Sequence, residues 1–361
     1  MHNGIRQARL WRGLDQQELA RLAGVSRQTI GSIESGRSDP STAVALSLAS
    51  ALERTVEDLF ALEPAAGLRV RPATSLSPAA PGSRRVVLAS IGGSWVAHAL
   101  PADALATSAD GLLSPRSTRA RPLRPRVSLR TTVLVAGCDP ALALLAAHLA
   151  ERRAGVRLVW LQAASTAALS AVARGEAHLA GAHLFDEESR EFNVPFVRAL
   201  LPGRGALVVN LARWREGLAV AKSNPRRIGG IKDLGRPDVR VAPREPGAGA
   251  RRLLDRLLAR HRVGAVRGPV LGSHAAVAQA VALGAVDAGV TTESAALAAG
   301  LRFLPLAEER SDLVLPLEFS REPRGARLLE TLASAAFRRD LGAIAAYEAR
   351  QCGAVVAEVR A

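Results

Sequence analysis

The chain has 361 residues, of which 48% are hydrophobic, and its formal net charge is +15. This length and apolar content suit two or three globular domains and exclude a short or disordered chain. Its two cysteines, Cys138 and Cys352, lie far apart without metal-ligand spacing, and no apolar run reaches the roughly 18 residues of a membrane span, which excludes a disulfide framework and a membrane-embedded class.

Residues 13–36 carry the spacing of two short helices joined by a tight turn. Asp15 stands where an N-cap belongs and Glu18 follows three residues later, a capping-box spacing that predicts a helix over residues 16–23. A glycine then ends this helix, and Ser26 caps the next one. The apolar residues that recur at three- and four-residue steps and predict one shared buried face are Leu19, Leu22, Val25, Ile30 and Ile33.

Residues 3–62 resemble the Xre-type repressor domain through "GLDQQELARLAGVSRQTIGSIESGRSDPS" and "ALSLASALERTVEDLF". The resemblance implies an all-α domain of five helices that binds a double-stranded DNA operator, with Gln28 reading bases and Arg37 holding a phosphate. A helical hairpin of some other domain is the alternative interpretation of these residues. The full set expected to contact DNA is Gln16, Gln17, Ser26, Arg27, Gln28, Thr29, Ser32 and Arg37.

The charge of this first domain does not by itself predict DNA binding, because residues 1–63 hold seven Arg against eight Asp or Glu. We therefore expect its cationic side chains to gather on the DNA side. Gly31, in the middle of the second helix, costs about 1 kcal/mol of helix propensity relative to Ala. It predicts either a close approach to the backbone or a slightly loose helix. The arginines expected on the DNA side are Arg6, Arg9, Arg12, Arg27 and Arg37.

Residues 64–130 are expected to connect this domain to the rest of the chain. Residues 64–83 are rich in Pro, Ala, Ser and Gly, which predicts a linker. Residues 86–96 predict a β-hairpin turning at a Gly-Gly pair. Residues 101–130 have no clear period, so the segment is predicted to be a small β-containing connector whose arginines either contact DNA flanks or are simply solvated.

From residue 131 the pattern changes to short apolar strands alternating with amphipathic helices, which predicts an α/β domain. In such sheets ligands bind where strands end and helices begin, and helix N-termini favour anions. The expected strands are 131–137, 156–162, 178–185, 206–210, 239–245 and 285–292, and the expected helices are 139–153, 165–176, 247–261 and 273–284.

Residues 131–345 resemble the molybdate-type periplasmic-binding-protein domain, and residues 346–361 are left as a C-terminal tail. The resemblance rests on "AGCDPALALLAAHLA", "STAALSAVARGEAHLAGAHLFD", "NVPFVRALLPGRG", "GIKDLGRPDVRVAPREPGAGARRLLDRLL" and "SHAAVAQAVALGAVDAGV". It implies an α/β domain of two lobes, with crossings near 206–220 and 301–315. The glycine loop that usually reads Gly-Ser-Gly-Thr-Arg is here Gly247 to Arg251 without the two hydroxyl residues, which weakens the inference that the family's oxyanion is the ligand.

We expect a small anionic effector, such as molybdate, at the junctions of strands and helices. A purely structural role is the alternative for the candidate side chains. His183 and His274 would then be hydrogen-bonded core histidines, Ser165 would cap a helix, and Cys138 would be an inert buried side chain. The predicted ligand residues are Asp139, Ser165, Thr166, His183, Gly247, Gly249, Arg251, His274 and Thr291.

The resulting hypothesis is a cytoplasmic, homodimeric transcription regulator with an effector-sensing domain, without enzyme activity, cofactor, metal or membrane contact. No nucleophile elbow, Walker loop or metal motif favours an enzyme. Two alternatives stay open: the α/β domain could be only a dimerisation scaffold, or the chain could be a transport-type solute-binding protein.

Overall fold

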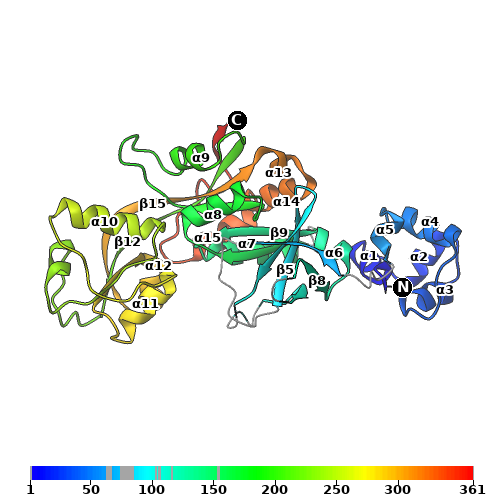
Figure 1. Ribbon diagram of the computed structural model, residues 1–361, viewed down its shortest axis with the longest axis horizontal. Coiled ribbons are helices and arrows are strands. Elements are labelled where there is room, and N and C mark those ends of the chain that lie inside the picture. The colour runs from blue at the N-terminus through cyan, green and yellow to red at the C-terminus, as the bar shows by residue number, and fades with distance from the viewer. Residues whose placement is uncertain are drawn as a thin grey trace. The chain divides into compact units, whose positions relative to one another are not determined.

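The computed structural model describes residues 2–61, 67–73, 85–101, 104, 107–114, 117–152 and 155–360 (Figure 1). These residues form two compact units, Met1–Thr132 and Val133–Ala361. Among the described residues, no helix has the length and apolar character needed to cross a bilayer.

Five helices build the start of the first unit, as predicted. Asp15 and Glu18 form the expected capping box of the second helix, and Ser26 caps the third. A two-residue pairing of β1 (His2–Asn3) with β2 (Phe60–Ala61) brings the ends of this helical domain together. The helices are α1 (Ile5–Trp11), α2 (Gln16–Ala23), α3 (Arg27–Glu34), α4 (Thr42–Ala51) and α5 (Val56–Leu59).

The core of the helical domain corrects one predicted residue. Leu19, Ile30 and Ile33 are buried as expected, but Leu22 is 47% exposed. The buried stripe of α2 runs through Leu19, Ala20 and Ala23, and at 3.6 residues per turn Leu22 lies roughly 100° away from its centre.

The connector is larger than predicted, because it forms a six-stranded sheet in the order β3-β8-β7-β5-β6-β4. The predicted hairpin is confirmed as β5 (Arg85–Ile91) and β6 (Ser94–Ala99), with positive φ at both turn glycines. The aperiodic stretch 101–130 supplies the two further strands β7 (Gly111–Leu113) and β8 (Arg119–Pro122) and a short helix, α6 (Arg126–Arg130).

The predicted linker 64–83 is corrected where the structure describes it. Residues 67–73 contribute β3 (Leu68–Arg69) and β4 (Arg71–Pro72) to the sheet, because Leu68 and Val70 alternate with arginines and bury their side chains. The remaining residues of that prediction, 64–66 and 74–83, lie outside the described residues.

The second unit is an α/β domain with one mixed sheet in the order β10-β9-β11-β15-β12-β14-β13, and β16 pairs with β12. All ten predicted strands and helices are present. The strands are β9 (Thr132–Gly137), β10 (Arg157–Gln162), β11 (Leu179–Ala182), β12 (Ala206–Val220), β13 (Val241–Ala242), β14 (Ala288–Thr292), β15 (Arg302–Pro316) and β16 (Val355–Val359). The helices are α7 (Ala141–Glu151), α8 (Ser165–Ala173), α9 (Val194–Leu200), η1 (Ile231–Gly235), α10 (Gly249–Arg260), α11 (His274–Ala282), α12 (Glu293–Ala298), α13 (Leu317–Arg321), α14 (Pro323–Leu332) and α15 (Ala335–Ala343).

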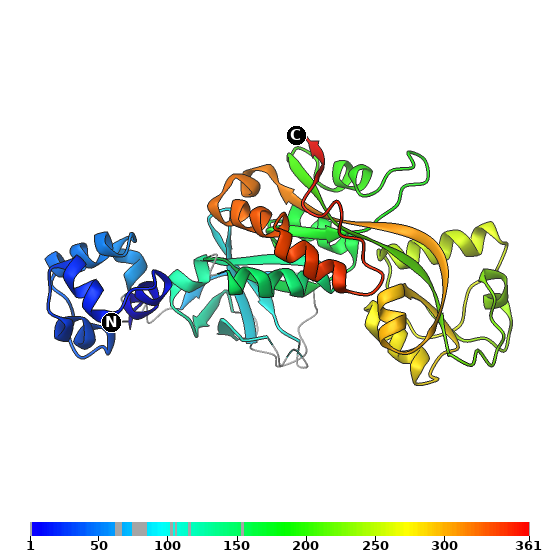
Figure 2. The ribbon, with the colours of Figure 1, turned by 180° about the vertical axis from the view of Figure 1, so that it is seen from behind.

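Two long antiparallel strands, β12 and β15, run through both lobes of this domain (Figures 1 and 2). The first lobe contains β9 to β11, β16, α7 to α9 and α13 to α15, and it has its own apolar core around Leu142, Leu313 and Phe337. The second lobe contains η1, β13, β14 and α10 to α12, with its core around Leu218 and Leu254. The predicted crossings at 206–220 and 301–315 coincide with these strands.

The register of the two crossing strands is irregular at two places, at Asn210/Ala212 within the first-lobe core and at Glu216/Gly217 between the two cores. Bulges of this kind locally bend and twist a strand pair. The side chains of Trp214 and Glu216 therefore lie where one lobe gives way to the other.

Residues 346–361, predicted as a tail, belong to the first lobe. Val355–Val359 pairs with β12 as β16, and Tyr347 and Cys352 lie in the first-lobe core. The strand has only five residues, VVAEV, which is too short a run to distinguish a strand from the end of a tail.

Candidate functional site

Helix α3 presents the side chains predicted to read DNA. Arg27 and Gln28 are exposed at its first turn, and Gln17 is exposed at the start of α2. The Oγ of Ser26 accepts a hydrogen bond from the backbone N–H of Thr29 at 3.0 Å, so this hydroxyl caps the helix. Arg37 is exposed in the following loop, where its Nε donates to Ser35 Oγ at 2.9 Å.

A buried ion pair fixes α3 against α1 and corrects part of the predicted basic face. Arg9 Nε lies 2.7 Å from Glu34 Oε1, and both side chains are almost fully buried. Gln16 donates to the other oxygen of Glu34 at 2.9 Å, which holds its amide at the start of α2. Arg12 pairs with Glu53 at 2.8 Å. Arg9 is therefore a structural residue rather than a DNA contact, because its charge is already compensated inside the domain.

Seven polar or aromatic side chains meet between the two lobes of the α/β domain, and we call them the interlobe cluster. The first lobe provides Cys138, after β9, and His183, after β11. The second lobe provides Arg244, after β13, and His274, the first residue of α11. The crossing strands contribute the remaining side chains, Trp214 and Glu216 of β12 and Glu309 of β15. All seven residues are buried.

His183 lies at the centre of the interlobe cluster. Its Nε2 lies 3.1 Å from Cys138 Sγ. Its Nδ1 lies 3.6 Å from Glu216 Oε1 and 3.9 Å from Glu309 Oε2. His274 Nε2 lies 3.6 Å from the same Glu216 oxygen. Glu216 therefore stands between an imidazole of each lobe, close to both but outside hydrogen-bonding distance.

The cluster concentrates buried polar atoms that have no hydrogen-bond partner. Nine such atoms occur among the described side chains, and eight of them belong to the cluster. Each buried unsatisfied group costs about 1–3 kcal/mol, so native structures rarely leave several together. The eight atoms are His183 Nδ1, Trp214 Nε1, Glu216 Oε1 and Oε2, Arg244 Nη1, His274 Nδ1 and Nε2, and Glu309 Oε2.

Burial and mutual charges shift the pKa values of the cluster in opposite directions. Burial raises the pKa of Glu216 to about 7. Burial and the nearby Arg244 and His183 hold the pKa of His274 well below its ordinary value, so this imidazole is neutral. For His183 burial lowers the pKa, but Cys138 and Glu216 outweigh it, and the pKa lies well above its ordinary value.

Several predicted ligand residues support the cluster instead of pointing into it. Asp139 accepts hydrogen bonds from Ser311 and Tyr347 at 3.0 and 2.8 Å. Ser165 Oγ accepts from the backbone N–H of His183 at 3.2 Å. Thr291 Oγ1 donates to the carbonyl oxygen of His274 at 2.9 Å. Ser165 and Thr291 therefore hold the backbones of the two histidines, whereas Asp139 joins residues of β15 and the C-terminal segment.

Two predicted residues of the glycine loop join the lobes directly. Thr166 of the first lobe donates through its Oγ1 to the carbonyl oxygen of Gly247 in the second, at 3.1 Å. A Cβ at Gly249 would lie 2.5 Å from His183 Nδ1 and closer still to its carbonyl oxygen. Glycine is therefore required where α10 begins against His183.

The cationic residue predicted for ligand binding, Arg251, lies outside the interlobe cluster. Arg251 is partly exposed and pairs with Asp255 one helical turn later, at 2.8 Å. Arg244 is fully buried instead, with two nitrogens bonded to Glu245 and Nη1 left without a partner. On helix α10 the position of Arg251 faces away from His183, because Gly249 occupies that side.

Sequence reasoning missed Trp214, Glu216, Arg244 and Glu309, and it treated Cys138 as inert. One signal was available: Glu216 lies within the predicted crossing segment 206–220, and a carboxylate is rarely buried without a partner or ligand. The expectation that no metal site exists rested on spacing along the chain. Spacing is uninformative here because Cys138, His183 and His274 come from three separate segments.

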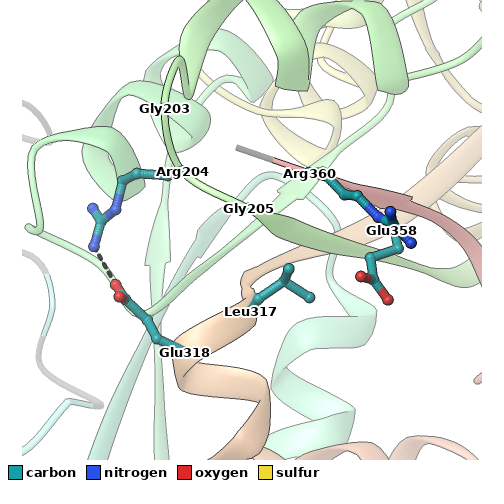
Figure 3. A pocket seen from close by; sticks show the side chains of 7 residues that line it. All are labelled: Gly203, Arg204, Gly205, Leu317, Glu318, Glu358 and Arg360. Carbon is teal, nitrogen blue, oxygen red and sulfur yellow. Dashed lines mark hydrogen bonds and ion pairs between the residues drawn. The ribbon is translucent and has the colours of Figure 1, made fainter.

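A hollow of about 360 Å³ lies elsewhere on the first lobe, beside residues 203–205 and α13 (Figure 3). Arg204 and Glu318 form an ion pair across it, and Glu358 and Arg360 at its other end are exposed. None of its side chains is among the buried polar atoms without a partner. We therefore assign it no ligand.

Comparison with known proteins identifies both parts of the chain. The PBP superfamily domain matches residues 146–333, and a helix-turn-helix domain matches residues 5–59. YvgK of Bacillus subtilis is 31% identical over 233 residues, which cover 63% of this chain and 75% of YvgK. The HTH-type transcriptional regulator MJ0272 of Methanocaldococcus jannaschii is 41% identical over 63 residues, 18% of this chain and 96% of that protein.

Solved structures similar to the α/β domain include an effector-binding domain and a regulatory domain. The effector-binding domain of QuiR in complex with shikimate has a TM-score of 0.42 and 13% identity, covering 55% of this chain and 94% of that one. The regulatory domain of CcmR from Synechocystis PCC6803, in complex with 2-PG, has a TM-score of 0.40 and 17% identity, covering 59% and 95%.

Proposed function

Because this chain is a helix-turn-helix DNA-binding regulator that belongs to the PBP superfamily, we propose that a small ligand enclosed between the two lobes of its α/β domain controls its affinity for operator DNA. The observation that carries this proposal is the set of eight buried polar atoms without partners in the interlobe cluster. A ligand held there would satisfy atoms that are otherwise costly to bury.

The position of the cluster links ligand binding to lobe closure. Its members come from the first lobe, from the second lobe and from both crossing strands, so a ligand that contacts them all binds only when the lobes are closed. In this closed arrangement a hydrogen bond from Thr166 to the carbonyl oxygen of Gly247 joins the two lobes. A ligand that prefers one arrangement shifts the population toward it.

The small anion expected from the sequence, molybdate included, has one buried partner here, Arg244. The same anion would also lie beside Glu216 and Glu309, whose carboxylates are buried without partners. Negative charges placed close together in a medium of low dielectric constant repel each other strongly. Arg244 therefore favours an anionic effector, whereas Glu216 and Glu309 disfavour it.

On the DNA side, we propose that Gln28, with Arg27 and Thr29, reads bases in the major groove and that Arg37 holds a phosphate. The exposed start of α3 supports this assignment, because its side chains reach base edges when the helix enters the groove.

The test uses the full chain and a DNA site selected by that chain from a random pool. Thermal unfolding identifies which of molybdate, tungstate, sulfate, phosphate, small organic acids and divalent metals bind, because a ligand of the native state raises the unfolding midpoint. Operator affinity is then measured with and without each binder. We expect at least one binder to change that affinity by roughly 5- to 150-fold.

An operator affinity that stays the same with every binder would contradict the control by ligand. The α/β domain would then be a dimerisation scaffold, which is the second candidate function. A transport-type binding protein would instead show ligand binding without any selected DNA site.

A further inference from the structure

The side chains of the interlobe cluster also indicate which class of ligand they would take, an inference that rests on the proposed enclosure of a ligand between the lobes. We propose that Cys138, His183 and His274 bind one divalent transition-metal cation of the zinc type, with Glu216 as the fourth ligand. Their sulfur, nitrogen and oxygen atoms are the donors that zinc takes in proteins.

The geometry suits a single ion. One ligand atom from each of Cys138, His183 and His274 lies within 4.8 Å of the others. One ion can therefore stand within about 2.8 Å of all three, so small side-chain movements suffice to reach the 2.0–2.3 Å bonds of zinc. Glu216 Oε1 lies 3.6 Å from His274 Nε2 and 3.6 Å from His183 Nδ1, so this carboxylate borders the site on the side of the two histidines.

The unsatisfied atoms favour a cation. Both oxygens of Glu216 and both nitrogens of His274 are buried without a hydrogen-bond partner. A cation would take a lone pair from each of these side chains, whereas an anion would face the carboxylates of Glu216 and Glu309. Arg244 does not remove this preference, because Glu245 pairs with its guanidinium at 2.8 Å.

The donor set also selects among metals. A thiolate and two imidazoles are soft or borderline ligands, which suit zinc, copper or nickel, whereas magnesium and calcium prefer oxygen atoms alone. The contacts behind the ligands fit this role: Thr291 binds the backbone of His274, and Ser165 binds the backbone of His183. These contacts fix the backbones that carry the two imidazoles.

The site would join the two lobes. Cys138 and His183 belong to the first lobe, His274 begins a helix of the second, and Glu216 lies on a strand that crosses between them. A bound ion would therefore stabilise the closed arrangement by bonds to both lobes, and its removal would release His274 and α11 from the first lobe.

The experiment titrates the full chain, freed of metal with EDTA, with Zn²⁺ by calorimetry and with Co²⁺ by absorption spectroscopy. We expect one Zn²⁺ per chain and a thiolate-to-cobalt charge-transfer band, because Cys138 would be a direct ligand. Cys138→Ser should abolish that band, and Cys138→Ser, His274→Gln and Glu216→Gln should each weaken Zn²⁺ binding at least tenfold.

Two matched controls come from the same domain. Cys352→Ser removes the other buried cysteine, and His148→Gln removes a histidine that pairs with Asp340. Both should keep Zn²⁺ affinity and the cobalt band of the original chain. Circular dichroism and the unfolding midpoint in EDTA establish that each variant is folded, and Glu216→Gln tests the site without changing side-chain shape if Cys138→Ser is unstable.

The site is overturned if the original chain binds no Zn²⁺, or if the folded cluster variants bind it as tightly as the two controls do. Operator affinity separates this failure from failure of the proposed function. If the cluster variants lose Zn²⁺ binding and Zn²⁺ has no effect on operator affinity, the metal site is supported and the control of DNA binding is contradicted. If an anion changes operator affinity and the chain binds no Zn²⁺, the control of DNA binding is supported and the metal site is contradicted.

Discussion

Gly31 occupies the middle of α3, the helix proposed to read DNA, where an added methyl group would meet no atom within 4 Å. Its backbone is not in the left-handed region, unlike that of Gly24, which has a φ of 67° at the end of α2. The two glycines therefore make a matched pair with opposite expectations.

We expect Gly31→Ala to raise the free energy of unfolding of the helical domain by about 1 kcal/mol, because alanine loses less backbone entropy in a helix. Gly24→Ala should instead lower it, since positive φ is strained for a residue with a Cβ. Urea unfolding followed by circular dichroism measures both. Equal or lower stability for Gly31→Ala would show that the glycine relieves a constraint that the fold does not reveal.

Gln28 and Arg37 are predicted to make different kinds of DNA contact, although both are exposed. Gln28→Ala should cost about 1–3 kcal/mol on the selected operator and little on random DNA, because a base contact is lost. Arg37→Ala should weaken binding to both and flatten the salt dependence, because a phosphate contact is lost. Fluorescence anisotropy at several salt concentrations measures both effects. Equal losses on operator and random DNA for Gln28→Ala would remove this residue from base reading.

At the residue scale, the role of a side chain could be predicted from the sequence when its partners are neighbours along the chain. The prediction failed when the partners are distant in the sequence. The capping roles of Asp15 and Ser26 depend on the next three residues, so they could be predicted. Arg9 pairs with Glu34, which lies 25 positions away, and Arg244 was overlooked in favour of Arg251. No local pattern states which of several arginines will be buried.

At the element scale, Gly249 controls the contact between helix α10 of the second lobe and His183 of the first. An added Cβ would collide with the backbone of His183, which cannot move aside as a flexible side chain could. We expect Gly249→Ala to prevent full closure and to weaken Zn²⁺ binding by about 1–3 kcal/mol, the usual penalty of overpacking, or roughly 5- to 150-fold.

Calorimetry with Zn²⁺ checks this expectation, and Gly264→Ala is the control, because an added methyl group there meets nothing within 4 Å. If the two variants bind Zn²⁺ equally, closure of α10 onto His183 is not required for binding.

The α/β elements were predictable because their apolar periods are regular, and the crossing strands because the resemblance covers the whole domain. The sheet of the first unit was largely missed. Its strands β3, β4 and β7 have only two or three residues each, too few to establish a period of two. The interlobe cluster could not be predicted from spacing, since it exists only after β12 and β15 bring distant segments together.

At the scale of the whole molecule, a single helix-turn-helix contacts only one half-site of DNA. We therefore expect a homodimer on an inverted repeat whose half-sites lie about one helical turn, or ~34 Å, apart. Inserting five base pairs between the half-sites should reduce affinity strongly, because it turns one half-site to the opposite face of the duplex. Sedimentation of the chain alone and with the selected operator measures the stoichiometry. One chain per operator, with no effect of the insertion, would contradict the dimer.

The coupling between the ligand and DNA must be reciprocal, because both bind the same chain. If Zn²⁺ changes operator affinity by a given factor, saturating operator must change Zn²⁺ affinity by the same factor, typically 1–3 kcal/mol. Calorimetric titrations of Zn²⁺ with and without operator provide one factor, and anisotropy with Zn²⁺ or EDTA provides the other.

The variant Gly249→Ala tests the effect of Zn²⁺ on DNA binding separately from DNA binding itself. It should retain the operator affinity that the original chain has in EDTA, because the helical domain lies in a different compact unit from Gly249. It should lose the response to Zn²⁺, because the lobes no longer close around the ion. Unequal factors in the two titrations would mean that Zn²⁺ affects DNA binding through a second site, and a full response in Gly249→Ala would place that site outside the interlobe cluster.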